Sequence, residues 1–325
     1  MSETLRVFMI TSEWPTPQYP HQVPFIVRQV NSLRQAGVDV HVFAFRGNKN
    51  PLNYARAWKQ AQAEITKGHY DLVHAQWGQS GLLALPTRLP LVVTFRGDDL
   101  EGIVGDSRRY LLAGKILRQV SRFVARRADA IILVSEHLSK YLSRKDFMVI
   151  PSGLDLERFR LLPRAEARQQ LGFPADKKLA LFVGNPNEAR KRYTLARSVV
   201  EAIPEAELVL AWGVPHDQIP VFMNACDVMI CTSMHEGSPN IVKEALACNL
   251  PIVATDVGDI YQRIGNIPGC VVLPDARPET ITAALRQVLQ RGKRVNSRNT
   301  VLDLDETILT QRVIGVYKQA LLVRH

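Results

Sequence analysis

Apolar and polar positions alternate along the chain in two recurring patterns. Short apolar runs bounded by Gly, Pro or polar residues predict buried strands, and in the first half they lie at 5–11, 38–45, 71–76, 89–95, 129–135 and 147–150. Residues 25–36 have apolar positions at helical spacing and stop at Gly37, which predicts a helix. Strand, loop, helix and strand in this order form a βαβ unit.

The second half repeats the pattern. Strands are expected at 178–183, 207–212, 227–231, 251–255 and 270–273, and helices at 219–225, 278–291 and 306–323. The alternation predicts an α/β protein with two doubly wound sheets. The expected division is a first domain at 1–150, a linker at 151–176, a second domain at 177–305 and a final helix at 306–325.

Residues 229–258 carry the strongest local signals. The apolar run ends at Ser233, a polar loop follows, and Ser238-Pro239 opens an amphipathic segment that stops before Pro251. Ser is favoured as an N-cap and Pro at the first helical position, whereas Asn249 and the following Pro favour a helix end. The stretch therefore predicts strand, loop, helix and strand.

Two glutamates border this helix. Glu236 precedes it, and Glu244 lies about 8 Å beyond its entrance at 1.5 Å of rise per residue. The unpaired N–H groups at the helix start form an anion site, so a nucleotide-sugar fits: sugar hydroxyls on Glu236, pyrophosphate at the helix start and ribose on Glu244. The alternative is that both are ordinary charges at the edge of an α/β helix.

The stretch resembles the donor-binding signature of family 4 glycosyltransferases, in which two glutamates bracket seven residues and a strand like PIVAT with a DVGD tail follows. The resemblance implies the GT-B fold, two Rossmann-like domains facing a central cleft, with the C-terminal helix crossing back to the first domain. It also implies a retaining, metal-independent transfer from a UDP-, GDP- or ADP-sugar without a cofactor. The signature residues expected to bind the donor are Glu236, Gly237, Ser238, Pro239, Asn240, Ile241 and Glu244.

A second donor-binding loop is expected after residues 178–183. Gly184 at a strand exit and the cations Arg190 and Lys191 before a helix would cradle phosphates, although a solvated basic loop has the same composition. In the family, an Arg shortly after the glycine and a Lys six residues later bind the pyrophosphate. Lys191 stands at the Lys position, whereas Asn185 occupies the Arg position. Lys191, Arg190 and Glu236 are therefore expected to be catalytic.

The first half supplies the expected acceptor contacts, Trp14, His74, Asp98 and Asp99, all near carboxyl ends of strands. The alternative for His74 is a satisfied core residue, which a lone His within an apolar strand more often is. Family members commonly carry His-Gly where this chain has Arg96-Gly97. Arg96 is therefore expected to bind charge on the phosphate or acceptor and is included among the catalytic residues.

The charge of the chain is unevenly distributed. The formal net charge is +10, and residues 1–150 hold 20 Lys/Arg against 12 Asp/Glu, which is +8 of that total. Residues 107–127 are the densest part, with apolar positions at helical spacing and seven cations between them. Such a helix binds an anionic membrane surface, or it packs in the α/β layer with a solvated face. Nucleic acid is not expected because no recognition motif accompanies the charge.

Composition limits the function classes. The 325 residues are 46% hydrophobic and 22% charged, as in a soluble globular protein. We expect a cytoplasmic enzyme without a signal peptide, a membrane span or a metal site, peripheral on the membrane if residues 107–127 bind lipid. The expected acceptor is a glycan, lipid-linked or small molecule, in polysaccharide or glycolipid biosynthesis. A nucleotide-sugar epimerase and a non-catalytic nucleotide-sugar binding protein are the alternatives.

Overall fold

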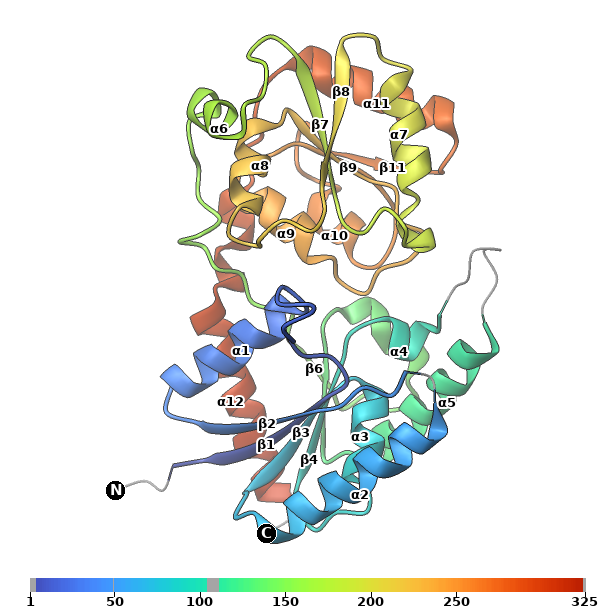
Figure 1. Ribbon diagram of the computed structural model, residues 1–325, viewed down its shortest axis with the longest axis vertical. Coiled ribbons are helices and arrows are strands. Elements are labelled where there is room, and N and C mark those ends of the chain that lie inside the picture. Colours follow the sequence, from blue (N-terminus) through green and yellow to red (C-terminus); the bar gives the residue numbers. More distant parts are fainter. Residues whose placement is uncertain (1–3, 49, 104–110, 324–325) are drawn as a thin grey trace. The chain divides into compact units, whose positions relative to one another are not determined.

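The computed structural model describes residues 4–48, 50–103 and 111–323. The chain divides into two compact units (Figure 1): unit 1 contains Met1–Gly153 and Glu306–His325, and unit 2 contains Leu154–Asp305. Each unit holds one sheet in which every pairing of neighbouring strands is parallel. Alternating helices and parallel sheets confirm the predicted α/β class.

Unit 1 has a six-stranded sheet in the order β2-β1-β3-β4-β5-β6. Its strands are β1 (Arg6–Thr11), β2 (Asp39–Ala44), β3 (Leu72–Gln76), β4 (Leu91–Phe95), β5 (Ala130–Leu133) and β6 (Met148–Val149). Its helices are α1 (Pro24–Gln35), α2 (Pro51–Lys67), α3 (Gly78–Ala84), α4 (Asp98–Glu101), α5 (Leu112–Arg127), the 3-10 helix η1 (Glu136–Tyr141) and α12 (Glu306–Val323).

The central strands of unit 1 are buried along their whole length. Every residue of β3 and β4 is buried, as expected for parallel strands covered by helices on both faces. The final helix α12 belongs to this unit and contacts α1, β4 and β5, with Leu309, Val313 and Val316 buried. The prediction that the C-terminal helix returns to the first domain is confirmed.

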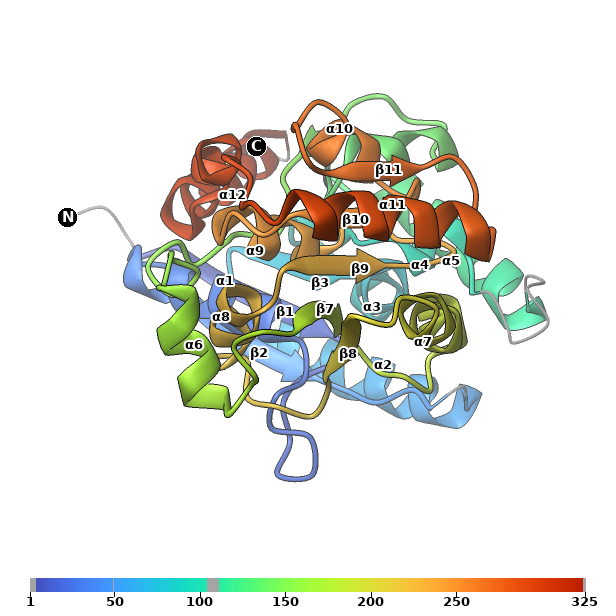
Figure 2. The same cartoon turned by 90° about the horizontal axis from the view of Figure 1, so that it is seen from above.

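Unit 2 has a five-stranded sheet in the order β11-β10-β9-β7-β8. Its strands are β7 (Lys178–Val183), β8 (Ala206–Ala211), β9 (Val228–Cys231), β10 (Ile252–Thr255) and β11 (Val271–Leu273). Its helices are α6 (Arg164–Leu171), α7 (Tyr193–Glu201), α8 (Ile219–Ala225), α9 (Asn240–Ala247), α10 (Ile260–Ile264) and α11 (Pro278–Arg291), with 3-10 helices η2 (Ala189–Lys191) and η3 (Arg298–Leu304). Helices α7 and α11 pack together, and α8 packs against α6 and α9 (Figure 2).

The strand order of unit 2 contains a topological switch point. From β7 the chain continues to β8 on one side and then crosses to β9 on the other side of β7. In open α/β sheets, the loops at the carboxyl ends of strands next to such a reversal form the ligand site. The loops that follow β7 and β9 are therefore the first place to look for a site in this unit.

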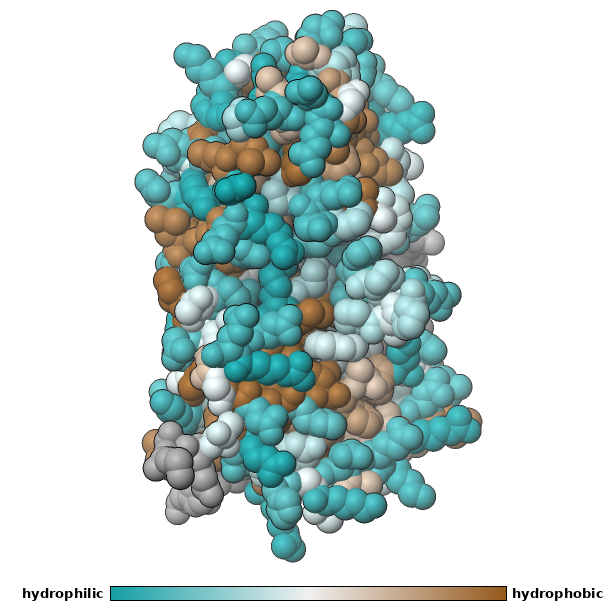
Figure 3. Space-filling view, turned by 60° about the vertical axis from the view of Figure 1, so that its left-hand side comes forward, coloured by the Kyte–Doolittle hydropathy of each residue, from teal (hydrophilic) through white to brown (hydrophobic). Residues whose placement is uncertain are grey.

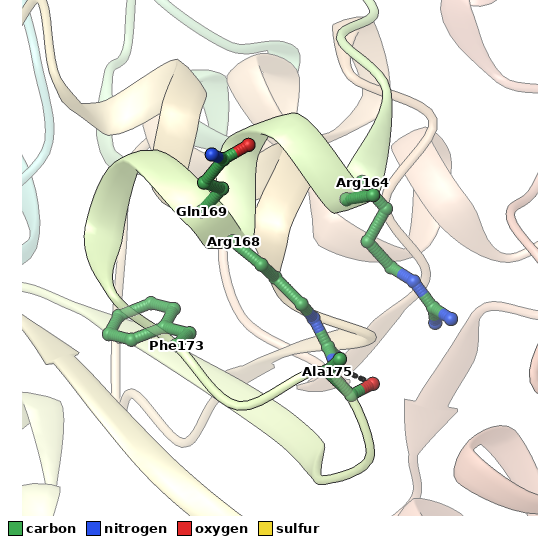
Figure 4. A pocket seen from close by; sticks show the side chains of 6 residues that line it. Arg164, Arg168, Gln169, Phe173 and Ala175 are labelled. Carbon is green, nitrogen blue, oxygen red and sulfur yellow. Dashed lines mark hydrogen bonds between the residues drawn. The ribbon is translucent and has the colours of Figure 1, made fainter.

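The expected linker, 151–176, is more ordered than its composition indicates. Residues 154–176 lie in unit 2 and include α6, which packs against α8. The Arg168 guanidinium donates to Asp227 at 2.8 Å and to the carbonyl of Ala175 at 2.7 Å. Figure 4 shows a pocket lined by Arg164, Arg168 and Gln169 of α6 and by Phe173 and Ala175, which follow the helix. Its arginines serve contacts within the unit, so we assign no ligand to it.

Hydrophilic side chains cover most of the face shown in Figure 3, with smaller hydrophobic areas between them. Among the described residues, no helix is long and apolar enough to cross a bilayer. Within the same residues, no group of three or more His, Cys, Asp or Glu side chains could hold a metal ion. The described cysteines are unpaired thiols.

Candidate functional site

A buried carboxylate and two cations meet at the switch point of unit 2. Lys191 Nζ lies 2.7 Å from Oε1 of Glu236, and Arg190 Nη1 lies 2.8 Å from Oε2. The Ser233 hydroxyl also donates to Oε1 at 2.8 Å. The cations follow β7 and Glu236 follows β9, so adjacent parallel strands bring together side chains that are 45 residues apart.

Lys191, Arg190 and Ser233 keep the Glu236 carboxylate ionised. Burial alone raises the pKa of a carboxyl group, because it disfavours the ionised form. The charges of Lys191 and Arg190 and the hydrogen bonds from Lys191 and Ser233 outweigh burial and lower the pKa of Glu236 to about 2. Glu236 is thus an ionised acceptor of hydrogen bonds at neutral pH.

Hydrogen bonds join the loop after β7 to the loop after β9. Met234 N–H donates to the carbonyl of Arg190 at 2.8 Å, and the Thr232 hydroxyl donates to the carbonyl of Lys191 at 2.8 Å. From β10, the Thr255 hydroxyl donates to the carbonyl of Ser233 at 2.6 Å. The carboxylate and its cations therefore rest on a backbone framework drawn from three neighbouring strands, which favours a preorganised site.

Gly184 and Asn185 open the first loop. Gly184 has φ +140°, a conformation that favours glycine, and a Cβ there would lie 3.6 Å from Cε of Lys191. The Asn185 side chain accepts a hydrogen bond from Asn187 N–H at 3.0 Å and so stabilises the turn. Asn185 occupies the family's Arg position but supplies a turn rather than a cation.

Helix α9 starts one residue later than the sequence predicts. Pro239 is its N-cap and Asn240 its first residue, while the Ser238 hydroxyl donates to Oδ2 of Asp259 at 2.8 Å. The expected capping role of Ser238 is thus wrong, because the carboxylate from the loop after β10 competes for its hydroxyl. Among the described residues, Asn240 Oδ1 is buried without a partner. A donor from a bound ligand would satisfy it.

Gly258 allows the loop after β10 to approach Glu236. Its φ is +62°, and a Cβ there would lie 2.4 Å from the carbonyl oxygen of Glu236 and 2.8 Å from that of Gly237. No side chain fits at these distances. The glycine of the DVGD segment therefore holds the Glu236 loop in place through backbone contact.

Glu244 has a partner that the sequence did not reveal. His216 Nε2 lies 3.0 Å from Oε1 of the buried Glu244, and the His216 ring packs edge-on against Phe159 at 5.4 Å. Within the described residues, His216 Nδ1 is buried without a partner. In the sequence, His216 is only a histidine in the loop after the strand expected at 207–212. That position alone does not identify it as a partner of Glu244.

His74 does not reach the surface. It is fully buried, with Nδ1 2.7 Å from the Tyr317 hydroxyl and Nε2 2.8 Å from the Thr94 hydroxyl. Burial, with a smaller effect of the Arg96 charge, lowers the pKa of His74 to about 3. This corrects the expected acceptor role: His74 is a neutral core residue that joins β3, β4 and α12.

Arg96 is held by neutral groups of unit 1. Its guanidinium donates to Gln76, Gln29 and Ser152 and lies over the Phe25 ring at 4.8 Å. Burial lowers the pKa of Arg96 to about 10, against the opposing charges of Asp99 and Glu306. In this conformation, the expected contact with phosphate is replaced by contacts that fix the loop after β4.

Asp99 is buried and accepts hydrogen bonds from the N–H groups of Arg96 at 3.1 Å, Gly97 at 3.0 Å and Gly78 at 3.1 Å. Burial raises the pKa of Asp99 to about 6, although these hydrogen bonds lower it. Its carboxylate joins the loop after β4 to the start of α3, which corrects the expected acceptor role of Asp99. Trp14 is half-buried and Asp98 is exposed, so these two expected acceptor contacts remain accessible.

Comparisons with known proteins show which families the chain matches. Residues 4–158 match the model of Glycosyltransferase Family 4, and residues 169–291 match that of Glycosyl transferases group 1. The chain is 23% identical to the putative teichuronic acid biosynthesis glycosyltransferase TuaC of Bacillus subtilis, over 98% of this chain and 97% of that protein.

Solved structures share the fold. The sucrose-phosphate synthase of Thermosynechococcus elongatus has a TM-score of 0.84 at 17% identity and covers 98% of this chain and 100% of its own. Anabaena Alr3699/HepE in complex with UDP-glucose has a TM-score of 0.69 at 16% identity, over 97% of this chain and 99% of its own. At these identities the structures support the architecture alone.

Proposed function

Since the chain belongs to the family 4 glycosyltransferases with the GT-B fold, we propose that it is a retaining enzyme that transfers a sugar from a nucleoside diphosphate sugar. The proposed acceptor is a glycan or lipid-linked molecule in cell-surface polysaccharide synthesis. The similarity to TuaC, a putative teichuronic acid biosynthesis glycosyltransferase, and to HepE, whose structure is a complex with UDP-glucose, supports this choice of pathway and donor class. Neither an epimerase nor a non-catalytic binding protein finds support among the family models.

The observation that carries the proposal is the contact of Lys191 and Arg190 with Glu236 at the switch point of unit 2. A donor diphosphate bound at this strand edge would lie between these cations and the first turn of α9, whose N–H groups favour anions. Glu236, held ionised, would accept hydrogen bonds from the donor sugar. Arg190 also contacts Glu188 at 2.6 Å, which orients its guanidinium.

In the proposed reaction, the bond between the anomeric carbon and the β-phosphate oxygen breaks and the acceptor oxygen bonds to that carbon on the same face. The acceptor hydroxyl proton passes to the leaving phosphate oxygen, so the products are the glycoside and a nucleoside diphosphate. No residue acts as a covalent nucleophile. Lys191, Arg190 and the α9 N-terminus stabilise the charge on the leaving group, an electrostatic contribution that needs no metal ion.

The nucleoside end of the donor is assigned to Glu244. Its carboxylate would accept hydrogen bonds from the ribose hydroxyls, and His216 would position it through the 3.0 Å contact. His216 is therefore a positioning residue for Glu244.

A donor and acceptor assay tests the proposal. The purified chain is incubated with UDP-, GDP- and ADP-sugars, with and without glycan acceptors, and NMR detects the new glycoside and its anomeric configuration. Lys191→Ala should lower turnover by about a hundredfold or more. Lys177→Ala should not, because Lys177 pairs with Glu207 and its side chain is 41% exposed. Glu244→Ala should raise the donor KM. A new epimer formed without acceptor, or full activity of Lys191→Ala, would contradict the proposal.

A further inference from the structure

Helix α5 of unit 1 has one face that packs inside the unit. Gly114, Ser121, Val124 and Ala125 are buried there, and α5 contacts α3. The packing is close, because a Cβ on Gly78 at the start of α3 would lie 2.1 Å from the Ser121 hydroxyl oxygen. The buried face of α5 therefore packs in the α/β layer, as one of the two interpretations of the basic segment expected.

The opposite face of α5 carries a second apolar stripe. Leu112, Ile116 and Phe123 are 73%, 58% and 42% exposed. At 100° and 1.5 Å per residue, the three side chains fall within about 40° around the helix and span roughly 16 Å along it. Large apolar side chains in a row on the outer face of a packed helix are not needed for that packing, and they indicate an interaction surface.

Cations border the stripe on both sides. Lys115 and Arg126 lie on one side of it and Arg127 on the other, all exposed, and the Arg127 guanidinium lies over the Phe123 ring at 5.2 Å. Residues 111–128 contain five Lys or Arg and neither Asp nor Glu. The outer face of α5 is therefore apolar in the middle and basic at both edges.

The other two arginines of α5 turn toward their own unit. The Arg118 guanidinium donates to the carbonyl of Glu101 and lies over the Tyr141 ring, and Arg122 Nε donates to the Tyr141 carbonyl at 3.0 Å. These contacts separate the cations that support the fold from those that face solvent. The second group is the one that accompanies the apolar stripe.

We propose that the outer face of α5 binds an anionic phospholipid surface. Leu112, Ile116 and Phe123 would enter the boundary between headgroups and acyl chains, while Lys115, Arg126 and Arg127 contact lipid phosphates. The apolar stripe alone could contact any apolar surface. The cations at its edges favour a negatively charged surface, so charge complementarity points to anionic phospholipids. The proposal does not depend on the donor residues, all of which lie in unit 2.

Vesicle flotation with the full chain tests the proposal. The chain should float with vesicles of phosphatidylcholine and phosphatidylglycerol in equal parts and remain unbound with phosphatidylcholine alone. Arg126→Gln/Arg127→Gln should weaken binding roughly thirtyfold at about 1 kcal/mol per cation. Lys293→Gln/Lys318→Gln removes the same charge from exposed lysines outside α5 and should keep the wild-type affinity.

A gain of binding tests the apolar stripe without relying on a damaged protein. Gln119 is exposed and lies on the same side of α5 as the stripe. Gln119→Leu should strengthen vesicle binding roughly tenfold, since a buried leucine side chain contributes about 1.5 kcal/mol or more. Gln319→Leu, the same change at an exposed position of α12, should not.

Three results would overturn the proposal. One is equal binding to neutral and anionic vesicles, and another is no binding to either. The third is equal loss in the α5 and control charge variants, which would assign binding to net charge. Thermal unfolding shows whether each variant is folded. A loss of binding with an unchanged Tm is then caused by the change at the surface of α5 and not by unfolding.

Discussion

Glu236 and His74 show at the residue scale how burial and neighbours fix a charge state. Both are buried, but Glu236 has two cations within 2.8 Å and stays ionised, whereas His74 has two hydroxyl partners and stays neutral. Sequence distinguishes neither case, because Lys191 is 45 residues from Glu236 and Tyr317 is 243 residues from His74. The chemistry of Glu236 was predictable only because a family signature surrounds it, and His74 had no such context.

The neutral state of His74 predicts a pH dependence of stability. The folded pKa is about 3 and the ordinary value is 6.5, so between these values the unfolded chain binds a proton that the folded chain does not. Stability from this group is complete above pH 6.5 and falls as pH is lowered, by up to about 1.4 kcal/mol per unit. His74→Gln should lose this slope between pH 6.5 and 5 in urea unfolding.

The control for this prediction is His69→Gln, because His69 is exposed and the substitution should leave the wild-type slope unchanged. Asp99, whose pKa is raised to about 6, contributes stability with the opposite sign, lost as pH rises from 3.8 to 6. The test therefore compares, at each pH, the free energy of unfolding of each variant with that of the wild type, so that the contribution of Asp99 cancels. An unchanged slope in His74→Gln would show that the imidazole is not the group responsible.

At the scale of elements, apolar runs predicted the strands well. Each strand of both sheets lies within about two residues of its expected position, because a strand buried on both faces needs a continuous apolar run. Helices α2, α3 and α6 are not among the predicted elements. Their buried faces rest on alanine, glycine or a buried arginine, as with Ala57 and Ala61 of α2 and Arg168 of α6, which give little hydrophobic periodicity.

The start of α9 marks the limit of local signals. Ser238-Pro239 has the composition of an N-cap and first residue, but Asp259 takes the serine hydroxyl. The loop after β10 therefore decides where α9 begins, and that loop is held by the contact of Gly258 with the backbone of Glu236. Register at this site is set by tertiary contact between two loops.

Gly258→Ala should consequently damage both stability and activity. The new Cβ would overlap the Glu236 carbonyl in a left-handed backbone conformation, so we expect a loss of about 1–3 kcal/mol and displacement of the Glu236 loop. Urea unfolding and the donor KM measure the two effects. Gly172→Ala is matched, since φ is +67° with nothing within 4 Å of the added Cβ. It should lose stability by backbone strain alone and keep the wild-type KM, and equal KM changes would contradict the contact argument.

At the scale of the whole molecule, the alternation of strands and helices gave the class, but not the order of the strands. Positions adjacent in space, such as the loops after β7 and β9, are separated in sequence by α7, β8, α8 and β9. The site was assembled from sequence through a family resemblance. The structure adds the physical reason, which is that both loops leave neighbouring strands at the switch point.

Unit 1 is built from two distant parts of the chain, because α12 follows unit 2 in sequence and completes unit 1. Leu309, Val313, Val316 and Ala320 are at most 3% exposed, and the Tyr317 hydroxyl bonds His74. A chain that ends after Asp305 would expose the sheet surface that these residues cover. We therefore expect unit 1 to lose its cooperative fold while unit 2 keeps its own.

Hydrogen exchange with peptide resolution measures this outcome. In the chain ending after Asp305, peptides from β3 and β4 should exchange rapidly, while those from β7 and β9 stay protected. A chain ending after Leu321 lacks Leu322 and Val323, which are 76% and 69% exposed, and should match the full chain. If β3 and β4 remain protected from exchange without α12, unit 1 folds without this helix and the prediction is wrong. If β7 and β9 also lose protection, α12 stabilises both units together, and unit 2 does not fold independently of it.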